Sequence, residues 1–197
     1  YSNNMENLLI TTKVSEPFKD VNDTDWFKAD VEEIYNYGFT QGTTATTYSP
    51  NNEITRGEFA VMIARALELT VRSGATEFKD TEDKWYANEV QALKDASIVS
   101  GFGDGTFDGD KTITRQEATK MLLNMLEYAK VDTTTKSQVN LVDMDKVSDF
   151  AKHSVQFLAE KGVLVGDGNK KFNPTNNLTR AEMAKILVKA LKLTDLY

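Results

Sequence analysis

The sequence has no cysteine among its 197 residues, and it holds one histidine, three prolines and two tryptophans. The absence of cysteine excludes a disulfide framework and thiolate chemistry. The single histidine, His153, has no second histidine or cysteine to complete a metal site, so we expect it to be a surface residue. No stretch approaches the roughly eighteen apolar residues that a membrane-spanning helix needs. We therefore predict no membrane span, no metal and no other cofactor.

An excess of basic residues is also missing. The net charge is −7, and nucleic-acid binding would need a basic stripe that the sequence does not contain. Hydrophobic residues make up 40% of the chain and charged residues 27%, which is typical of a globular protein with a core. The chain begins with Tyr1, and residues 1–17 lack the basic-then-apolar pattern of a signal peptide, so we expect a fragment or a mature chain without its leader. A cysteine-free composition fits a cytosolic protein and an exported Gram-positive one equally well.

What the chain does contain is a pattern that occurs three times. Each copy opens with an apolar residue and an aspartate, continues with an aromatic residue and a turn, and ends with a hydrophobic-Thr-Arg-x-Glu segment. The aspartate lies 36, 35 and 37 positions before the arginine in the three copies. So many coincident residue types at steady offsets indicate a genuine internal repeat. The paired residues are Asp20 and Arg56, Asp80 and Arg115, and Asp143 and Arg180.

The arginine of each copy begins a predicted amphipathic helix. Apolar residues follow it at the i, i+3, i+4, i+7 and i+8 spacing of a helix with one buried face. The preceding threonine and a glutamate three residues after it have the spacing of a capping box, namely Thr55 with Glu58, Thr114 with Glu117 and Thr179 with Glu182. A shorter helix comes before, and we expect it to stop at a left-handed residue, which is Gly38, Ser97 or Gly162. The loops between the two helices leave room for a short strand near Tyr48, Phe107 and Phe172.

The three copies organise the chain. Residues 18–70, 78–129 and 141–193 form the repeats, and residues 1–17, which match none of them, are an extension or linker. One copy alone buries too little apolar surface for comfortable stability, whereas three copies can share one core. We therefore predict one cooperative all-α domain of three helix-loop-helix repeats.

The repeated Asp, aromatic and Thr-Arg-x-Glu positions resemble the S-layer homology (SLH) domain of bacterial surface proteins, over residues 18 to about 193. The resemblance implies a pseudo-threefold spindle with a central three-helix bundle formed by the second helices. It also implies an extracellular module at the cell wall or S-layer of a Gram-positive bacterium. Its partner would be a secondary cell-wall polysaccharide linked to peptidoglycan, bound in inter-repeat grooves through a pyruvylated N-acetylmannosamine terminus. A cargo domain or surface array would lie elsewhere in the full-length chain.

The resemblance also implies glycan-binding residues at matching positions of the three copies. A permanently charged, planar guanidinium at a helix N-terminus suits the carboxylate of a pyruvyl group, aromatic faces suit sugar rings, and glycines let a loop backbone approach closely. We expect the groove that combines Arg56 with the Trp85 region to bind best, and the groove that relies on the third copy's aromatic residue to be the weakest. The implied residues are Arg56, Arg115 and Arg180, then Trp26, Trp85 and Phe150, and finally Gly42, Gly101 and Gly166.

Each of these residues also has a purely structural interpretation. The arginines could pair with carboxylates of the next repeat, and the tryptophans could pack in the core. Asp20, Asp80 and Asp143 are expected to cap the first helix or to tie down the turn after it. The alternative function is accordingly a helical-repeat scaffold for protein interactions that binds no glycan.

Two further chemistries fit the residues poorly. An EF-hand-like alignment of Asp104 to Asp110 puts Arg115 where calcium needs a bidentate glutamate, so the calcium motif fails. An enzyme would need a nucleophile with a base or a specifically placed carboxylate pair, and nothing in the sequence places one. We therefore predict that the chain is not an enzyme.

Overall fold

The computed structural model describes residues 17–74 and 76–196, and within these ranges the chain is helical with only isolated β-bridges and no strand. The predicted all-α class is thus confirmed. The unmatched segment 1–16, with its Leu8-Leu9-Ile10 cluster, lies outside the described residues. The helices are α1 (Lys28–Asn36), α2 (Arg56–Ala66), α3 (Ala87–Asp95), α4 (Arg115–Tyr128), the 3₁₀ turn η2 (Met144–Lys146), α5 (Asp149–Glu160) and α6 (Arg180–Leu191).

The second helix of every copy begins at a capping box, as predicted. The Thr55 hydroxyl accepts a hydrogen bond from the Glu58 amide at 3.2 Å, and the Glu58 carboxylate accepts one from the Thr55 amide at 2.8 Å. Both reciprocal bonds are also present at the starts of α4 and α6. Because the first amides of a helix have no partner within it, these bonds determine where α2, α4 and α6 begin.

The first helices begin without a side-chain cap and end at a left-handed residue. The φ angles are +75° at Gly38, +60° at Ser97 and +71° at Gly162, which confirms the predicted stops. In the second copy a serine takes up a conformation that costs an L-residue about 1 kcal/mol relative to glycine.

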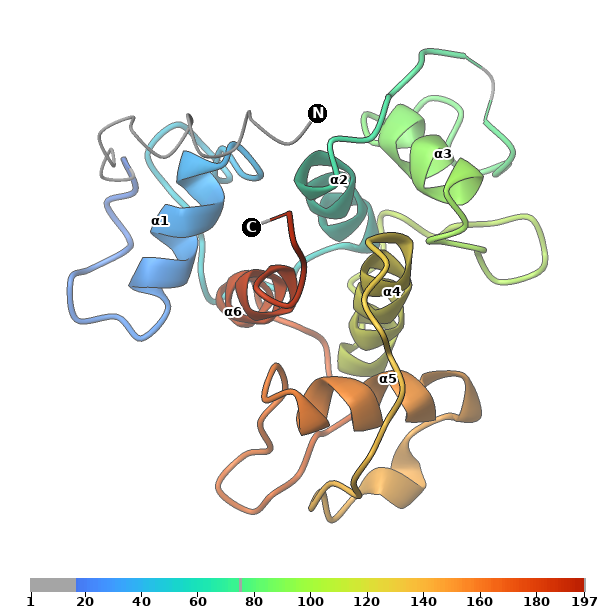
Figure 1. The fold of residues 1–197 in the computed structure, drawn as a ribbon. Helices are drawn as coiled ribbons and strands as arrows, with labels where there is room; N and C mark the ends of the chain where they lie inside the picture. The colour runs from blue at the N-terminus through green and yellow to red at the C-terminus, as the bar shows by residue number, and fades with distance from the viewer. Residues whose placement is uncertain (1–16, 75, 197) are drawn as a thin grey trace.

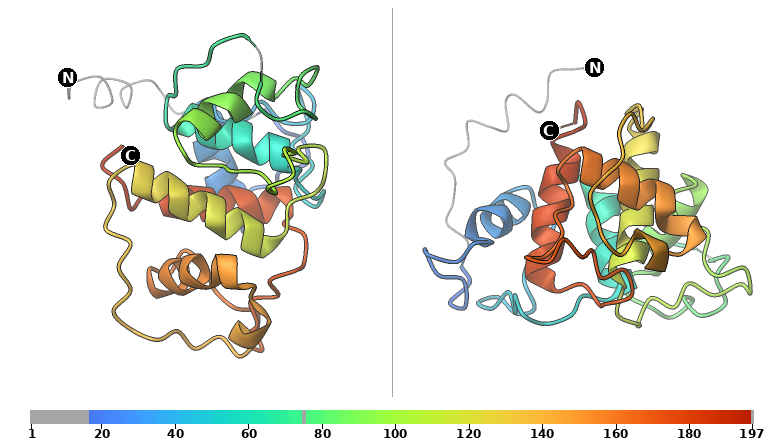
Figure 2. Two further views of the ribbon diagram at one scale, coloured as in Figure 1. Left: turned by 90° about the vertical axis from the view of Figure 1, so that its right-hand side faces the viewer. Right: turned by 90° about the horizontal axis from the view of Figure 1, so that it is seen from below.

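Each first helix packs on the second helix of another copy. Helix α3 packs against α2, α5 against α4, and α1 against α6, while α4 also touches α6. Figure 1 shows α2, α4 and α6 around the middle of the molecule with α1, α3 and α5 outside them, and Figure 2 shows the same arrangement from two other sides. Because α1 of the first copy packs on α6 of the last copy, the repeats form a closed cycle rather than an open row.

A ring of backbone hydrogen bonds joins the segments just before α2, α4 and α6. The Ile54 amide donates to the Leu178 carbonyl at 2.9 Å, Leu178 donates to Ile113 at 3.0 Å, and Ile113 donates to Ile54 at 3.0 Å. All three side chains are almost completely buried. These hydrogen bonds give the buried backbone groups of the three segments their partners.

The short strands expected near Tyr48, Phe107 and Phe172 are absent from the described residues, where only isolated bridges occur.

The repeated aspartates hold the loop between the two helices of their own copy. The Asp143 carboxylate accepts hydrogen bonds from the amides of Phe172 and Asn173, both at 2.8 Å. Asp20 and Asp80 hold the same position in their copies, where each accepts two amides of its own inter-helix loop. The expectation that they cap the first helix is wrong, because none of these helices has a side-chain cap, whereas each aspartate does tie down the loop that follows its first helix. They join the entrance of each copy to a loop almost thirty residues later in the chain.

Candidate functional site

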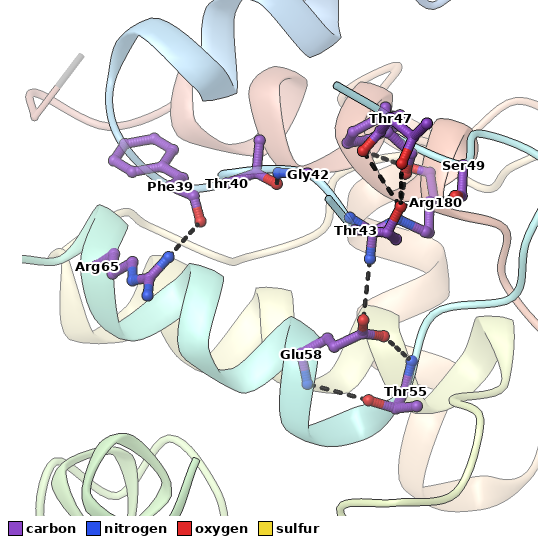
Figure 3. A network of polar contacts seen from close by, with 11 residues as sticks. Phe39, Thr40, Gly42, Thr43, Thr47, Ser49, Thr55, Glu58, Arg65 and Arg180 are labelled. Carbon is purple, nitrogen blue, oxygen red and sulfur yellow. Dashed lines mark hydrogen bonds and ion pairs between the residues drawn. The ribbon is translucent and has the colours of Figure 1, made fainter. Parts of the chain in front are cut away.

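Each arginine of the Thr-Arg segments connects its own copy to a neighbouring one. In the contact drawn in Figure 3, the Arg180 Nη1 donates to the Glu58 carboxylate at 3.0 Å. The Arg180 Nε donates to the Tyr48 carbonyl at 2.7 Å. Glu58 is also the capping-box glutamate of α2, so one carboxylate serves both a helix start and a contact between copies.

The other two arginines repeat this geometry around the cycle. Arg56 binds the Phe107 carbonyl at 3.0 Å and Glu117 at 3.3 Å. Arg115 binds the Phe172 carbonyl at 2.8 Å and Glu182 at 2.9 Å. Only 7% of Arg56 and 3% of Arg180 is exposed, and Arg115 is partly exposed. Each arginine thus pairs with a carboxylate of the next copy, as the structural interpretation expects. A guanidinium has five N–H groups, so each arginine keeps N–H groups beyond the two that make these bonds.

A pocket of about 260 Å³ lies beside Arg56 and draws on all three copies. The Arg56 guanidinium lies close to two rings, with its central carbon 4.6 Å from the Phe102 centroid and 4.9 Å from the Phe107 centroid. Burial lowers the pKa of this guanidinium, and the charge and hydrogen bond of Glu117 oppose the shift. The lining residues that carry chemistry are Arg56, Phe102, Glu117, Lys120, Asn124 and Phe150.

This pocket corrects the expected pairing of grooves and aromatics. Arg56 shares the pocket with Phe150 of the third copy, and Trp85 does not line it. The reason is the packing order of the helices, because α5, which begins beside Phe150, lies on α4, whereas α3 beside Trp85 lies on α2. The groove expected to be the weakest is therefore the one in which the structure combines a guanidinium, an ammonium group and aromatic rings.

The aromatic residues at the starts of the first helices are exposed in all three copies. The exposed fraction is 56% for Trp26, 64% for Trp85 and 52% for Phe150. The residue after each of them is buried instead, so the interpretation of the tryptophans as core residues is wrong. A cation lies beside Trp26, since the Lys185 Nζ is 5.0 Å from the indole centroid. Lys185 is the fifth residue after Arg180, as Lys120 is the fifth after Arg115.

The loop glycines satisfy packing inside their own copies. Gly42 and Gly101 have left-handed φ angles of +81° and +70°, and a Cβ at either position would lie within 2.5 Å of the Phe18 or Phe78 ring. Gly101 also lines the pocket beside Arg56. Gly166 lacks the left-handed φ, and a Cβ there would meet the backbone of Lys170 at 2.8 Å. The close approach that these positions permit is thus made by the protein's own atoms.

The structure adds three residues that the sequence did not single out. Phe102 is 49% exposed, and the sequence signal for it was a phenylalanine directly after Gly101 in a polar loop. Lys120 and Asn124 lie on α4 beside its apolar stripe, where a sequence pattern predicts an ordinary solvated face. Within the described ranges, no helix combines the length and apolar character that a membrane crossing requires.

The comparisons with known proteins agree with the repeat. A family model described as the S-layer homology domain matches residues 17–60, 77–119 and 141–184. An endoglucanase of Bacillus sp. (strain KSM-635) is 33% identical over 87% of this chain and 18% of its own length. The exoglucanase XynX of Acetivibrio thermocellus is 33% identical over 96% of this chain and 18% of its length. An S-layer protein of Bacillus thuringiensis subsp. finitimus is 29% identical over 89% of this chain and 21% of its length.

The chain spans about a fifth of the length of each of these relatives. Relatives with enzyme names and an S-layer protein thus share the region matched here. The three family matches fall on the three copies, and each contains the aspartate, the exposed aromatic residue and the Thr-Arg-x-Glu segment of its copy. The chain therefore belongs to the S-layer homology family, as a cell-surface, cell-wall-associated module of three repeats.

Proposed function

We propose that the chain anchors a larger protein non-covalently to the cell wall by binding a secondary cell-wall polysaccharide in the grooves between repeats. The observation that carries this proposal is the pocket in which Arg56, Lys120 and the exposed rings of Phe102 and Phe150 meet. Exposed aromatic rings beside fixed positive charge are suited to a sugar that carries a carboxylate. A pyruvylated N-acetylmannosamine terminus has this chemistry.

The geometry divides the work between two kinds of residue. Arg56 is fixed by Phe107 and Glu117, so it presents its remaining N–H groups in a prearranged orientation and loses little freedom on binding. Glu117 neutralises part of its charge, and Lys120 supplies a second cation for an anionic sugar. Phe102 and Phe150 offer apolar faces for the ring of the sugar. Arg115 with Trp26 and Arg180 with Trp85 are the corresponding residues of the two other grooves.

Weak binding in each groove is sufficient for anchoring. A polysaccharide presents many chain ends, and a surface protein presents many copies, so simultaneous contacts multiply the overall affinity. The full-length chain then carries its cargo on the same polypeptide. The names of the endoglucanase and the exoglucanase relatives support a hydrolase domain as that cargo, and the name of the S-layer relative supports a surface-array domain.

Sedimentation with purified cell-wall sacculi tests the proposal. We expect the chain to sediment with intact walls and to stay in solution with walls stripped of the polysaccharide or lacking its pyruvyl groups. Phe150→Ala and Phe102→Ala should weaken binding at least several-fold without lowering the melting temperature, because both side chains are about half exposed. Tyr128→Ala, which removes a similarly exposed ring at the end of α4, is the matched control. Undiminished binding to depyruvylated walls would exclude the carboxylate mechanism.

A scaffold that binds no glycan is the second candidate, and the buried arginine–glutamate contacts favour it. Arg56→Ala and Arg115→Ala separate the two functions. A folded variant that no longer binds walls supports anchoring through the arginine. A large loss of stability with wall binding retained in the folded fraction supports the scaffold, since the arginines would then act only between copies.

A further inference from the structure

A second pocket lies inside the third copy, away from the groove that holds Arg56. It measures about 480 Å³ and opens between the segment before η2, the end of α5 and the loop after α5. Its lining includes the apolar residues Val139, Leu141, Ala159 and Leu164 and the polar residues Glu160 and Lys170. Of the residues expected to contact glycan, Gly166 alone lines it, and the repeat pattern does not account for it.

The other two copies show which groups fill the same place. In the first copy, the Phe18 and Tyr35 rings meet edge to face with centroids 5.4 Å apart. In the second copy, the Lys94 Nζ lies 5.1 Å from the centroid of Phe78. The matching residues of the third copy are Leu141 and Ala159, so both members of the pair are smaller there.

The surrounding backbone is held in the same way in all three copies. Lys19, Lys79 and Val142, each one residue after the compared side chain, donate to a loop carbonyl at 2.9, 3.0 and 3.0 Å. The aspartate that follows each of them accepts two loop amides. Because these bonds keep the loop at a fixed separation, the smaller side chains leave an open space that the chain cannot close by collapse.

The loops of the first two copies are shaped around an aromatic ring. The hypothetical Cβ of Gly42 would be 2.4 Å from the Phe18 ring, and that of Gly101 would be 2.5 Å from the Phe78 ring. In the third copy the corresponding atom of Gly166 would be 3.1 Å from Leu141. The side chains of the other copies therefore indicate that this site accepts a planar ring. The space beside Ala159 corresponds to the one that the Tyr35 ring fills in the first copy.

We propose that the third-copy pocket binds the side chain of a tyrosine from a partner polypeptide. The apolar lining residues suit the face of the ring, while the polar ones suit a hydroxyl, and tyrosine combines both characters. The Glu160 carboxylate in the lining accepts hydrogen bonds from the amides of Lys136 and Ser137 at 2.9 and 3.1 Å, so its position is fixed. The inference does not rest on glycan binding in the Arg56 groove, because the pocket shares no lining residue with it.

The test uses the whole chain and p-cresol, the isolated side chain of tyrosine, observed by NMR. We expect saturable shifts and ring-to-methyl cross-relaxation at Leu141 and Val139. N-acetyl-tyrosinamide should bind at the same methyls, which tests entry of the side chain with its backbone attached. Cyclohexylmethanol has a similar size without aromaticity, and equal binding of it would reduce the pocket to a non-specific apolar hollow and overturn the proposal.

A variant whose side chains fill the pocket provides the second test of the proposal. The Leu141→Phe, Ala159→Tyr variant restores the pair found in the first copy and should weaken p-cresol binding by about tenfold or more. Tyr35→Ala is the matched control, since it opens the first copy and leaves the third unchanged. Retained cresol binding in the folded, filled variant would overturn the proposal. If that variant does not fold, the methyl cross-relaxation in the unaltered chain decides alone, and its absence contradicts the proposal. Wall sedimentation should be the same in all these variants.

Discussion

At the scale of single residues, this molecule uses charged side chains chiefly to join segments that are far apart in the sequence. The Asp143 carboxylate is almost completely buried and is satisfied by two amides of a loop in its own copy. Arg180, also buried, binds a carbonyl and a carboxylate of the first copy. A buried charge is tolerated only when such partners are present, so these residues cannot be exchanged freely.

Replacing Asp143 with alanine tests this role. We expect Asp143→Ala to lower the free energy of unfolding by about 2–3 kcal/mol, because two amides lose a charged acceptor in a buried place. Urea unfolding followed by circular dichroism measures the change. Asp145→Ala, which removes an exposed carboxylate two residues later, is the control and should change stability by less than about 0.5 kcal/mol. An equal effect of the two variants would contradict the role assigned to Asp143.

At the scale of helices, the contacts between copies are built from different pairs of side chains. The second residue of α2, α4 and α6 makes the same backbone bond in each copy, and it is Gly57, Gln116 or Ala181. Tyr86 packs against Gly57, where a Cβ would be 2.5 Å from its ring. Gln116 instead exchanges two hydrogen bonds with Ser148 at the start of α5. The contact between α2 and α3 thus places a small residue against a large one, whereas the contact between α4 and α5 uses a hydrogen-bonded pair.

The size match at Gly57 leads to a prediction that opposes helix propensity. Alanine is a better helix former than glycine by about 1 kcal/mol, yet we expect Gly57→Ala to destabilise the protein by about 1–3 kcal/mol through overpacking against Tyr86. Thermal and urea unfolding measure the net effect. Combining it with Tyr86→Ala should cost less than the sum of the two single changes. Gly74→Ala is the control because its Cβ would meet nothing, and a stabilised Gly57→Ala variant would contradict the packing argument.

The same contact predicts a pH dependence. The Asp110 carboxylate pairs with Lys84 and accepts a hydrogen bond from the Tyr86 hydroxyl at 2.9 Å, and these two contacts, that of Lys84 first, hold the pKa of Asp110 below its ordinary value. A group with a lowered pKa in the folded state stabilises the protein fully above its unfolded pKa of about 3.9 and loses that contribution as the pH falls through the folded value.

We therefore expect Asp110→Asn to be less stable than the unaltered chain at pH 7 by about 1 kcal/mol or less, because the site is exposed. The difference should shrink as the pH falls below about 4. Melting temperatures of both proteins between pH 7 and pH 2 measure it, with Asp149→Asn as a comparison at an exposed pair within one helix. A difference that grows on acidification would refute the assigned sign.

At the scale of the whole molecule, the chain is closed on itself. Helix α1 packs on α6, Ile54 donates to Leu178, and Arg180 binds Glu58, so the first and last copies share a contact of the same kind as sequential copies. Closure of this kind leaves no copy with an open apolar end, whereas an open row of repeats needs special terminal copies.

Removing the third copy should therefore affect more than the residues deleted. We expect a chain of residues 1–140 to lose cooperative unfolding, because α1 loses its partner α6 and Ile54 loses its backbone acceptor. The complete chain should unfold in a single transition, measured by calorimetry and by circular dichroism. A sharp, native-like transition in the truncated chain would show that two copies suffice.

Much of the local structure could be read from the sequence because it depends on neighbours along the chain. The capping boxes at Thr55, Thr114 and Thr179 need only a threonine and a glutamate three residues apart, and they appear where predicted. The left-handed stops at Gly38 and Gly162 likewise follow from the freedom of glycine at positive φ. The number of copies and the helical class follow from the repeat itself.

The candidate site depended on distance in space rather than along the chain. Repeat spacing cannot say which neighbour a first helix packs on, so the sequence paired Arg56 with Trp85, while the structure places it with Phe150. For the same reason the sequence did not predict that Phe102 lies beside Arg56, or that the two smaller side chains of Leu141 and Ala159 leave a pocket. The sequence by itself determined the elements, since capping and turn formation are local. Only tertiary packing decided the grooves, because they are formed where side chains of different copies meet.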